Sequence, residues 1–349
     1  MKLPKFPRII KNFFSLTGLC LLLYVMAFCI LSCSNYGFFW GRFDQNEVDE
    51  RSGTVQDFNR YAPDLSVVSN PNWESGHEIF TAEGKRRYSV LVITDLHYGS
   101  SKEDINEAAF LTWLESIYKA GGENVPRFAI NLGDSADGGH ENEYDNYILF
   151  EKKIKALAGK YLWNEDENTA DDKRKFRIFS ILGNHDLYNN GSKYFLKKLF
   201  PYSSSYHFTI DTDISDDYSG FSYYFLDTAN GTTGPTQLED FKTKIYADPH
   251  PKVILTHYPI WAGGTDSAFA FMIIQNSMER NLLLTYFIEN NVKYVLEGHA
   301  HKNYGVDYGG QFKEEVIGSL RFSSRDAKQC AVFTVDEEKS TVTTQVYKF

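Results

Sequence analysis

The chain has 349 residues, and its 36 basic and 46 acidic residues give a formal net charge of −10. Apolar residues make up 42% and charged residues 23% of the chain, a globular composition that excludes a fully disordered protein. The acidic balance argues against a protein that holds nucleic acid on a broad basic surface. A phosphate-bearing ligand would therefore need a local positive charge.

The first 33 residues have the pattern of an export signal or a membrane anchor. Their charged residues are all basic and lie before residue 12, and no residue from Phe13 to Leu31 is charged. The apolar run is typical of an export signal, and it is also long enough to span a bilayer. It ends Ile30-Leu31-Ser32-Cys33, which resembles the lipobox of bacterial lipoproteins, where the peptide is cut before a cysteine that is then acylated. A lipoprotein acylated at Cys33 and a plain anchor both place the rest of the chain in the cell envelope, exported and membrane-anchored, on the periplasmic or cell-surface side.

The remaining chain is predicted to form one domain behind a short lead-in. Residues 34–77 are rich in Asn, Asp, Ser and Gly, which predicts a tether or lead-in segment with some ordered contacts. Residues 78–349 are predicted to form the folded domain.

Within this domain, short β-rich runs alternate with helical patterns. In chain order we expect a strand at 88–94, a helix at 103–120, a strand at 128–132, a helix at 144–162, strands at 176–182 and 222–227, a helix at 237–246, a strand at 252–256, a helix at 277–290 and a strand at 292–296. Residues 311–349 are strand-rich with a polar turn at 336–339, and they predict antiparallel strands. Strands that alternate with helices predict a layered α/β fold.

Five of the predicted strands end in side chains that can ligate metal ions. These ends read Asp95-Leu96-His97, Gly133-Asp134, Gly183-Asn184-His185-Asp186, His257 and Gly298-His299-Ala300-His301. Loops at the carboxyl ends of strands in α/β sheets converge on one crevice, so we expect these side chains to meet. In the two pairs with one intervening residue, alternate residues of extended backbone can point the same way and chelate.

The residue types fit two divalent transition-metal ions. Carboxylate, imidazole and amide oxygen suit manganese, iron or zinc. The candidate ligands are too many for one zinc and fit two ions that share one carboxylate; they are Asp95, His97, Asp134, Asn184, His257, His299 and His301.

In this order, the five groups resemble the calcineurin-like metallophosphoesterase superfamily, over about residues 85 to 325. The resemblance implies a four-layer α-β-β-α sandwich, two mixed sheets flanked by helices. It implies that one ion is held by Asp95, His97, Asp134 and His301. It implies that a second ion is held by Asp134, Asn184, His257 and His299, with Asp134 bridging. It also implies that His185 protonates the leaving oxygen and that Asp137 orients His185.

Two differences from other members of this superfamily narrow the class of enzyme that the chain resembles. Purple acid phosphatases carry a tyrosine where Asp137 stands, and Ser/Thr protein phosphatases have Arg-Gly where this chain has Gly138-Gly139. The remaining pattern is similar to class III cyclic nucleotide phosphodiesterases. We therefore expect an exported two-metal hydrolase of a small phosphoester, a phosphodiester or nucleotide first and a phosphomonoester second. The alternatives are a nuclease, a phospholipid-headgroup hydrolase and a non-catalytic surface lipoprotein that binds a ligand.

Overall fold

The computed structural model describes residues 45–52, 55–57, 87–100, 107–163, 176–201, 203–210, 220–261, 272–320 and 328–349. The predicted signal or anchor with Cys33, and most of the predicted lead-in, lie outside these residues. Within the described ranges, no helix combines the length and the hydropathy that a membrane span requires.

The elements alternate along the chain as the sequence predicts. In order they are α2 (Gln45–Ser52), β1 (Gln56–Asp57), β2 (Arg87–Ile93), α5 (Glu107–Ala120), β3 (Pro126–Asn131), α6 (Glu141–Trp163), β4 (Ile178–Ser180), the 3₁₀ helix η4 (His185–Asn190), α7 (Ser192–Tyr194), the π-helix η5 (Phe195–Leu199), β5 (Tyr206–Ile210), β6 (Phe221–Phe225), α8 (Pro235–Ala247), β7 (Lys252–Leu255), α9 (Ser277–Glu289), β8 (Val292–Glu297), β9 (Tyr304–Asp307), β10 (Lys313–Val316), β11 (Gln329–Asp336) and β12 (Thr341–Lys348).

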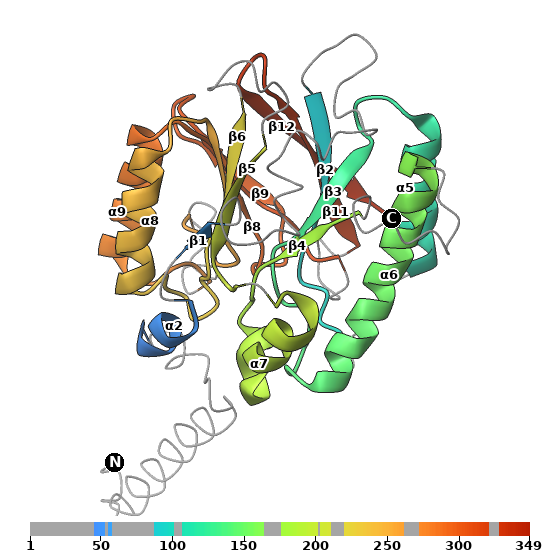
Figure 1. The fold of residues 1–349 in the computed structure, drawn as a ribbon, viewed down its shortest axis with the longest axis horizontal. Helices are drawn as coiled ribbons and strands as arrows, with labels where there is room; N and C mark the ends of the chain where they lie inside the picture. The colour runs from blue at the N-terminus through green and yellow to red at the C-terminus, as the bar shows by residue number, and fades with distance from the viewer. Residues whose placement is uncertain are drawn as a thin grey trace, which may run out of the picture.

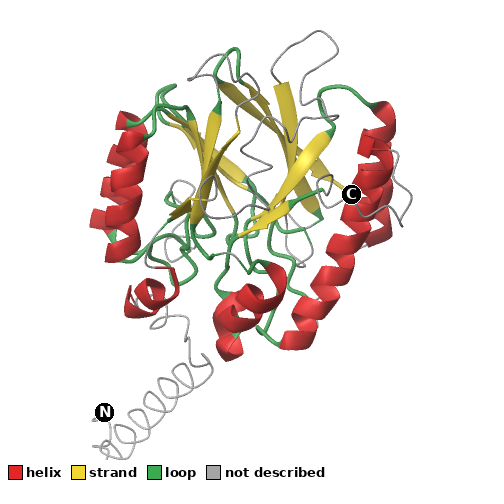
Figure 2. Ribbon diagram, in the orientation of Figure 1, coloured by secondary structure: helices red, strands yellow, loops and turns green. Residues whose placement is uncertain are grey.

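Two sheets pack face to face, and helices cover the outer face of each (Figure 1). The larger sheet has the strand order β1-β5-β6-β7-β8-β10-β9, and the smaller has the order β12-β11-β2-β3-β4. Figure 2 shows α8 and α9 outside the larger sheet and α5 and α6 outside the smaller one. This arrangement confirms the predicted four-layer sandwich of two mixed sheets.

Each sheet contains a parallel run whose strands end at the same edge. In the smaller sheet, β2 is parallel to β3 and β3 to β4. In the larger sheet, β6 is parallel to β7 and β7 to β8. The antiparallel hairpin of β11 and β12 completes the smaller sheet through β2. The loops after both parallel runs therefore leave from one end of the sandwich, as the sequence argument requires.

Strand β2 shows why the predicted strands read as continuous apolar runs. Val90 and Val92 belong to the core between the sheets, whereas Leu91 and Ile93 belong to the core between the smaller sheet and its helices. Successive side chains of a strand point to opposite faces, so a strand covered on both faces is apolar at every position. Burying each such side chain stabilises the fold by roughly 1.5–3 kcal/mol.

The lead-in and two edges of the sheets differ from the simple prediction. Helix α2 and strand β1 lie within the segment expected as a tether, and β1 pairs with β5. The sequence of α2, QNEVDERS, has no apolar stripe, so hydrophobic periodicity does not reveal it. The strand expected at 176–182 is shorter, because β4 lies at the sheet edge and pairs with β3 only over Ile178–Ser180.

Candidate metal centre

The predicted ligands come together at the ends of strands from both sheets. Two follow β2, one follows β3 and one follows β4 in the smaller sheet, and one follows β7 and two follow β8 in the larger; in that order they are Asp95, His97, Asp134, Asn184, His257, His299 and His301. Asn184 and His301 are partly exposed, and the other five are buried.

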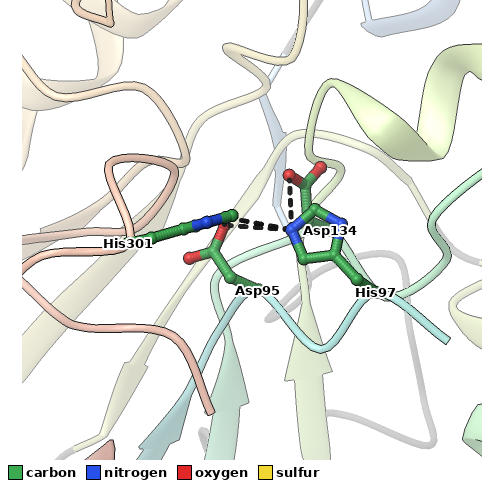
Figure 3. Close-up of side chains that lie close together, drawn as sticks. All are labelled: Asp95, His97, Asp134 and His301. Atoms are coloured by element: carbon green, nitrogen blue, oxygen red, sulfur yellow. Dashed lines mark hydrogen bonds and ion pairs between the residues drawn. The ribbon is translucent and has the colours of Figure 1, made fainter. Parts of the chain in front are cut away.

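The first group consists of Asp95, His97, Asp134 and His301, and Figure 3 shows these side chains turned toward one another. His301 Nε2 lies 3.2 Å from Asp95 Oδ1 and 3.0 Å from His97 Nε2. His97 Nε2 lies 3.6 Å from Asp134 Oδ2. One donor atom from each of the four residues lies within 4.8 Å of all the others, which is the spacing of atoms gathered around a single cation.

The second group consists of Asp134, His257 and His299, with Asn184 beside them. His257 Nε2 lies 3.4 Å from Asp134 Oδ2 and 3.1 Å from Asn184 Oδ1. The same oxygen of Asp134 thus faces a histidine nitrogen of each group.

Hydrogen bonds made by Nδ1 of His257 and of His97 determine which nitrogen of each imidazole ring faces the centre as an acceptor. His257 Nδ1 lies 2.7 Å from the carbonyl oxygen of Leu132, and His97 Nδ1 lies 3.1 Å from Asp137 Oδ1. Since both partners accept hydrogen bonds, Nδ1 is the donor in each ring and a neutral ring keeps its Nε2 lone pair. The Nε2 atoms therefore face the centre and could hold a metal ion.

Two buried carboxylate oxygens indicate that the two groups of residues are suited to bind cations. Asp95 Oδ1 and Asp134 Oδ2 are buried, and among the described residues neither has a hydrogen-bond partner. Their other oxygens are satisfied: Thr94 Oγ1 donates to Asp95 Oδ2 at 2.8 Å, and the His185 N–H donates to Asp134 Oδ1 at 2.8 Å. A buried acceptor without a donor is costly, and a divalent cation among these oxygens and imidazoles would satisfy both acceptors.

The backbone of the ligands is unusual and corrects one expectation. Five predicted ligands have left-handed backbone conformations, with φ of 53°, 47°, 53°, 66° and 50° at Asp95, His97, Asp134, His299 and His301. The prediction that the paired ligands lie on extended backbone was therefore wrong. Each such residue costs on the order of 1–3 kcal/mol, and such strain is concentrated at functional sites. Here the strained turns bring both members of a pair to one point.

Glycines let two of these turns approach closely. Gly133 has a φ of 102°, and a Cβ there would lie 2.6 Å from the backbone nitrogen of Gly183. A Cβ on Gly183 would in turn overlap the carboxylate and backbone nitrogen of Asp134. The glycines that precede Asp134 and Asn184 therefore allow the loops after β3 and β4 to pack together.

Opposite charges in the centre shift one another's pKa values. Burial favours the neutral form of Asp95, but the charges of His301 and His257 outweigh it and lower the pKa of Asp95 to about 2. Burial also disfavours the charged form of His257, yet Asp134 raises the pKa of His257 to about 9. Burial lowers the pKa of His299 well below its usual value. A proton on His257 therefore competes with a cation for Nε2.

His185 lies beside both groups without belonging to either four-ligand set. Its side chain is 28% exposed, and its Nδ1 donates to the backbone carbonyl of Asp137 at 2.7 Å. The Asp137 carboxylate lies 3.6 Å from His185 Nδ1 and 3.1 Å from His97 Nδ1. Asp137 thus orients His185 through its backbone carbonyl and not, as expected, through its carboxylate. The carboxylate lies closer to His97.

Asp186 has a structural role beside the candidate metal centre. Its carboxylate accepts hydrogen bonds from the backbone nitrogens of Ser135, Ala136 and Gly183 at 3.2, 3.0 and 3.0 Å. It also accepts one from the Tyr144 hydroxyl at 3.1 Å. Burial raises the pKa of Asp186 to about 6.

Sequence reasoning missed three hydroxyl side chains that support the ligands. Thr94 donates to Asp95 as described, and the Ser319 hydroxyl donates to the carbonyl oxygen of Asp95 at 2.9 Å. Thr228 Oγ1 accepts a hydrogen bond from the backbone nitrogen of His257 at 3.1 Å. Thr228 comes directly after a predicted strand, so the rule that found the ligands would also have found it. Ser319 has no such signal in the sequence.

Comparisons with known proteins identify the family of the chain. A family model described as calcineurin-like phosphoesterase matches residues 88–303. A search of curated proteins finds no match. Among solved structures, the chain is similar to a dimetal phosphatase from Danio rerio, with 11% identity, a TM-score of 0.50, and coverage of 75% of this chain and 99% of that chain.

The chain is also similar, with lower TM-scores, to two further solved structures. GAP50, the anchor in the inner membrane complex of Plasmodium, has 15% identity and a TM-score of 0.47, with 75% of this chain and 88% of that chain covered. Purple acid phosphatase PPD1 from yellow lupin seeds has 10% identity and a TM-score of 0.46, with 74% and 53% covered. The family match extends over more than half of the sequence. The chain therefore belongs to the calcineurin-like phosphoesterase family and is a metal-dependent phosphoesterase.

Proposed function

We propose that the protein hydrolyses a phosphodiester or a nucleotide with the help of two divalent ions of manganese, iron or zinc. The observation that carries this proposal is the position of Asp134 Oδ2, 3.6 Å from His97 Nε2 and 3.4 Å from His257 Nε2. One carboxylate oxygen that faces both ligand groups is the arrangement that two neighbouring ions need.

The seven gathered side chains divide into two sets that share this carboxylate. One ion would be held by Asp95, His97, Asp134 and His301, and the other by Asp134, Asn184, His257 and His299. The pair would supply a Lewis acid for the phosphoryl oxygens and a water activated for attack on phosphorus. Two divalent ions carry more charge than the two aspartates return, so this acidic chain can still attract a phosphate group.

His185 is the general acid of the proposed reaction. Its Nδ1 is committed to the carbonyl of Asp137 at 2.7 Å, so Nε2 is the nitrogen that would exchange a proton with the leaving oxygen. The partial exposure of the ring, 28%, leaves it accessible to substrate.

The two glycines after Asp137 favour a phosphodiester over a phosphomonoester. Gly138-Gly139 occupies the place where Ser/Thr protein phosphatases have an arginine, so these two positions offer no fixed cation for a dianionic phosphate. The similarity to class III cyclic nucleotide phosphodiesterases points the same way. We also propose that the enzyme works in the cell envelope, tethered through lipid on Cys33 or through an uncleaved helix.

A substrate screen tests the proposal. The full chain, purified in detergent, should hydrolyse bis-p-nitrophenyl phosphate with Mn²⁺, Zn²⁺ or Fe²⁺, and faster than p-nitrophenyl phosphate. Asp134→Asn should lose bound metal and hydrolysis together, whereas Asp145→Asn, which removes an exposed carboxylate on α6, should keep both. Bound metal without hydrolysis of any mono- or diester would contradict the proposal and favour a binding module.

A further inference from the structure

The loop that comes after β6 holds the backbone of His257. Strands β6 and β7 are parallel neighbours, so the loop after β6 and the residues after β7 leave the sheet side by side. Thr228 Oγ1 accepts hydrogen bonds from the backbone nitrogens of His257 at 3.1 Å and Tyr258 at 3.0 Å. Residues 227–234 are all buried. This loop therefore fixes where the His257 backbone lies.

Arg51 of helix α2 forms hydrogen bonds with side chains of this loop. Its Nε and Nη2 donate to the two carboxylate oxygens of Asp227 at 2.7 and 2.9 Å, and Nη2 also donates to Asn230 Oδ1 at 2.7 Å. The side chains of Arg51 and Asp227 are 6% and 0% exposed. Asp227 Oδ1 also accepts the backbone N–H of Ala229 at 3.2 Å. The guanidinium thus closes the turn that contains Thr228.

The helix that carries Arg51 precedes the family domain. The family match begins at residue 88, whereas α2 spans Gln45–Ser52. Further polar contacts join this helix to the same region: Asn230 donates to Glu47 Oε2 at 3.2 Å, and the backbone nitrogen of Thr236 donates to Asp49 Oδ1 at 3.2 Å. Figure 1 shows α2 (blue) at the end of the sandwich below α8.

We infer that Arg51 is a positioning residue for His257, acting through Asp227 and Thr228. The inference rests on the proposed role of His257 as a ligand of the second ion. Without the guanidinium, Asp227 would be a buried charge with no cation beside it, and the loop would have to rearrange. Thr228 would then no longer fix the backbone nitrogen of His257, and the position of the ring would depend on its remaining contacts, among them that of Nδ1 with the carbonyl oxygen of Leu132.

A calorimetric titration of the metal-free full chain with Mn²⁺ tests this inference. Asn184→Ala removes a ligand of the second set and identifies the uptake step that belongs to it. Arg51→Met should weaken the same step by about 10–100-fold and leave the other step unchanged, because outer-sphere partners of ligating histidines act on affinity in this range. A merely structural role for Arg51 would lower thermal stability without this selective effect.

A second variant tests the route through Thr228. Thr228→Val keeps the side-chain shape but removes the hydroxyl that accepts the His257 N–H. If Arg51 acts through this hydroxyl, the effects of Arg51→Met and Thr228→Val should not add, and the double variant should match the weaker-binding single variant. Additive effects would overturn the proposed route.

Asp49→Ala is the matched control on the same helix, because Asp49 contacts Thr236 without touching Asp227. It should bind Mn²⁺ like the wild type in both steps. If Arg51→Met does not fold, Arg51→Lys should still weaken uptake of the second ion. An ammonium group cannot reproduce the planar bidentate contact of the guanidinium with the Asp227 carboxylate. Wild-type affinity in a folded Arg51 variant would overturn the inference.

Hydrolysis measured on the same preparations separates the two proposals. A wild-type chain that binds two Mn²⁺ but hydrolyses no ester contradicts the proposed function, while the titration still decides the role of Arg51. A wild-type chain that takes up none of Mn²⁺, Zn²⁺ and Fe²⁺ overturns both.

Discussion

Asp134 Oδ2 lies 3.4 Å from His257 Nε2, although Asp134 comes after a strand of the smaller sheet and His257 after a strand of the larger one. The candidate metal centre is therefore a junction between the two sheets. Side chains that meet in this way exist as a ligand set only when both sheets are folded and packed together.

Chelation should for this reason destabilise the whole domain. Ions that bind only the folded chain add about 2.7 kcal/mol of stability when free metal is at 100 times the dissociation constant. Removing Mn²⁺ with EDTA should lower the melting temperature by about 5–10 °C in calorimetry. Asp134→Asn serves as the control, and its melting temperature should not respond to EDTA. Equal melting temperatures of the wild type with and without chelator would contradict the account.

His185→Gln should keep both metal ions and lose rate, because His185 is outside both four-ligand sets. A missing general acid slows the reaction by about 10²–10⁴-fold, and most when the leaving group is poor. Rates for diphenyl phosphate and bis-p-nitrophenyl phosphate should therefore diverge. His140→Gln is the control, since His140 is an exposed histidine that contacts Asn189. Equal loss for both substrates would remove the acid role from His185.

Asp248 should make stability depend on acidic pH. Burial favours its neutral form, but a hydrogen bond from His250 and the charge of Lys252 lower the pKa of Asp248 to about 2. An aspartate with a lowered folded-state pKa stabilises the fold above its unfolded pKa, near 3.9, and loses this contribution as the pH falls through the folded value.

Asp248→Asn should therefore cost about 2 kcal/mol at pH 7, and the difference from the wild type should shrink as the pH falls from 4 toward 2. Urea unfolding at pH 7 and pH 3 measures this difference. Asp145→Asn removes an aspartate that is 57% exposed and paired with Lys198, and it should cost only about 0–1 kcal/mol. A cost for Asp248→Asn that does not change with pH would contradict the ion-pair explanation.

Acylation of Cys33 can be measured directly in cells. Radiolabelled palmitate should enter the wild-type chain and should not enter Cys33→Ala. Cys29→Ala, which changes another cysteine of the apolar run, should be labelled like the wild type. Equal labelling of Cys33→Ala would rule out the lipoprotein and leave the uncleaved anchor.

Much of the fold and the ligand set could be predicted because local sequence carries them. Strands such as β2 are buried on both faces, so they read as apolar runs, and the polar residue that ends each run marks where the sheet ends. Glycine before Asp134 and Asn184 marks turns that tolerate no side chain. These signals lie within a few residues of the ligands that they identify.

The supporting contacts could not be predicted, because they join residues far apart in sequence. Arg51 and Asp227 are 176 residues apart, and helix α2 has no apolar stripe that would place it on the domain. His299 has a left-handed backbone conformation with a φ of 66°, and no residue type near it requires that conformation. Local patterns therefore identified the candidate ligands that the structure brings together, but not the backbone that positions them.

Counting metal ions per chain tests the central claim most directly. Elemental analysis of the Mn²⁺-loaded full chain should find two ions in the wild type, one in His301→Ala, which removes a ligand of the first set only, and one in Asn184→Ala, which removes a ligand of the second set only. A wild type with fewer than two ions, or either variant with both, would contradict a centre of two ions joined by Asp134.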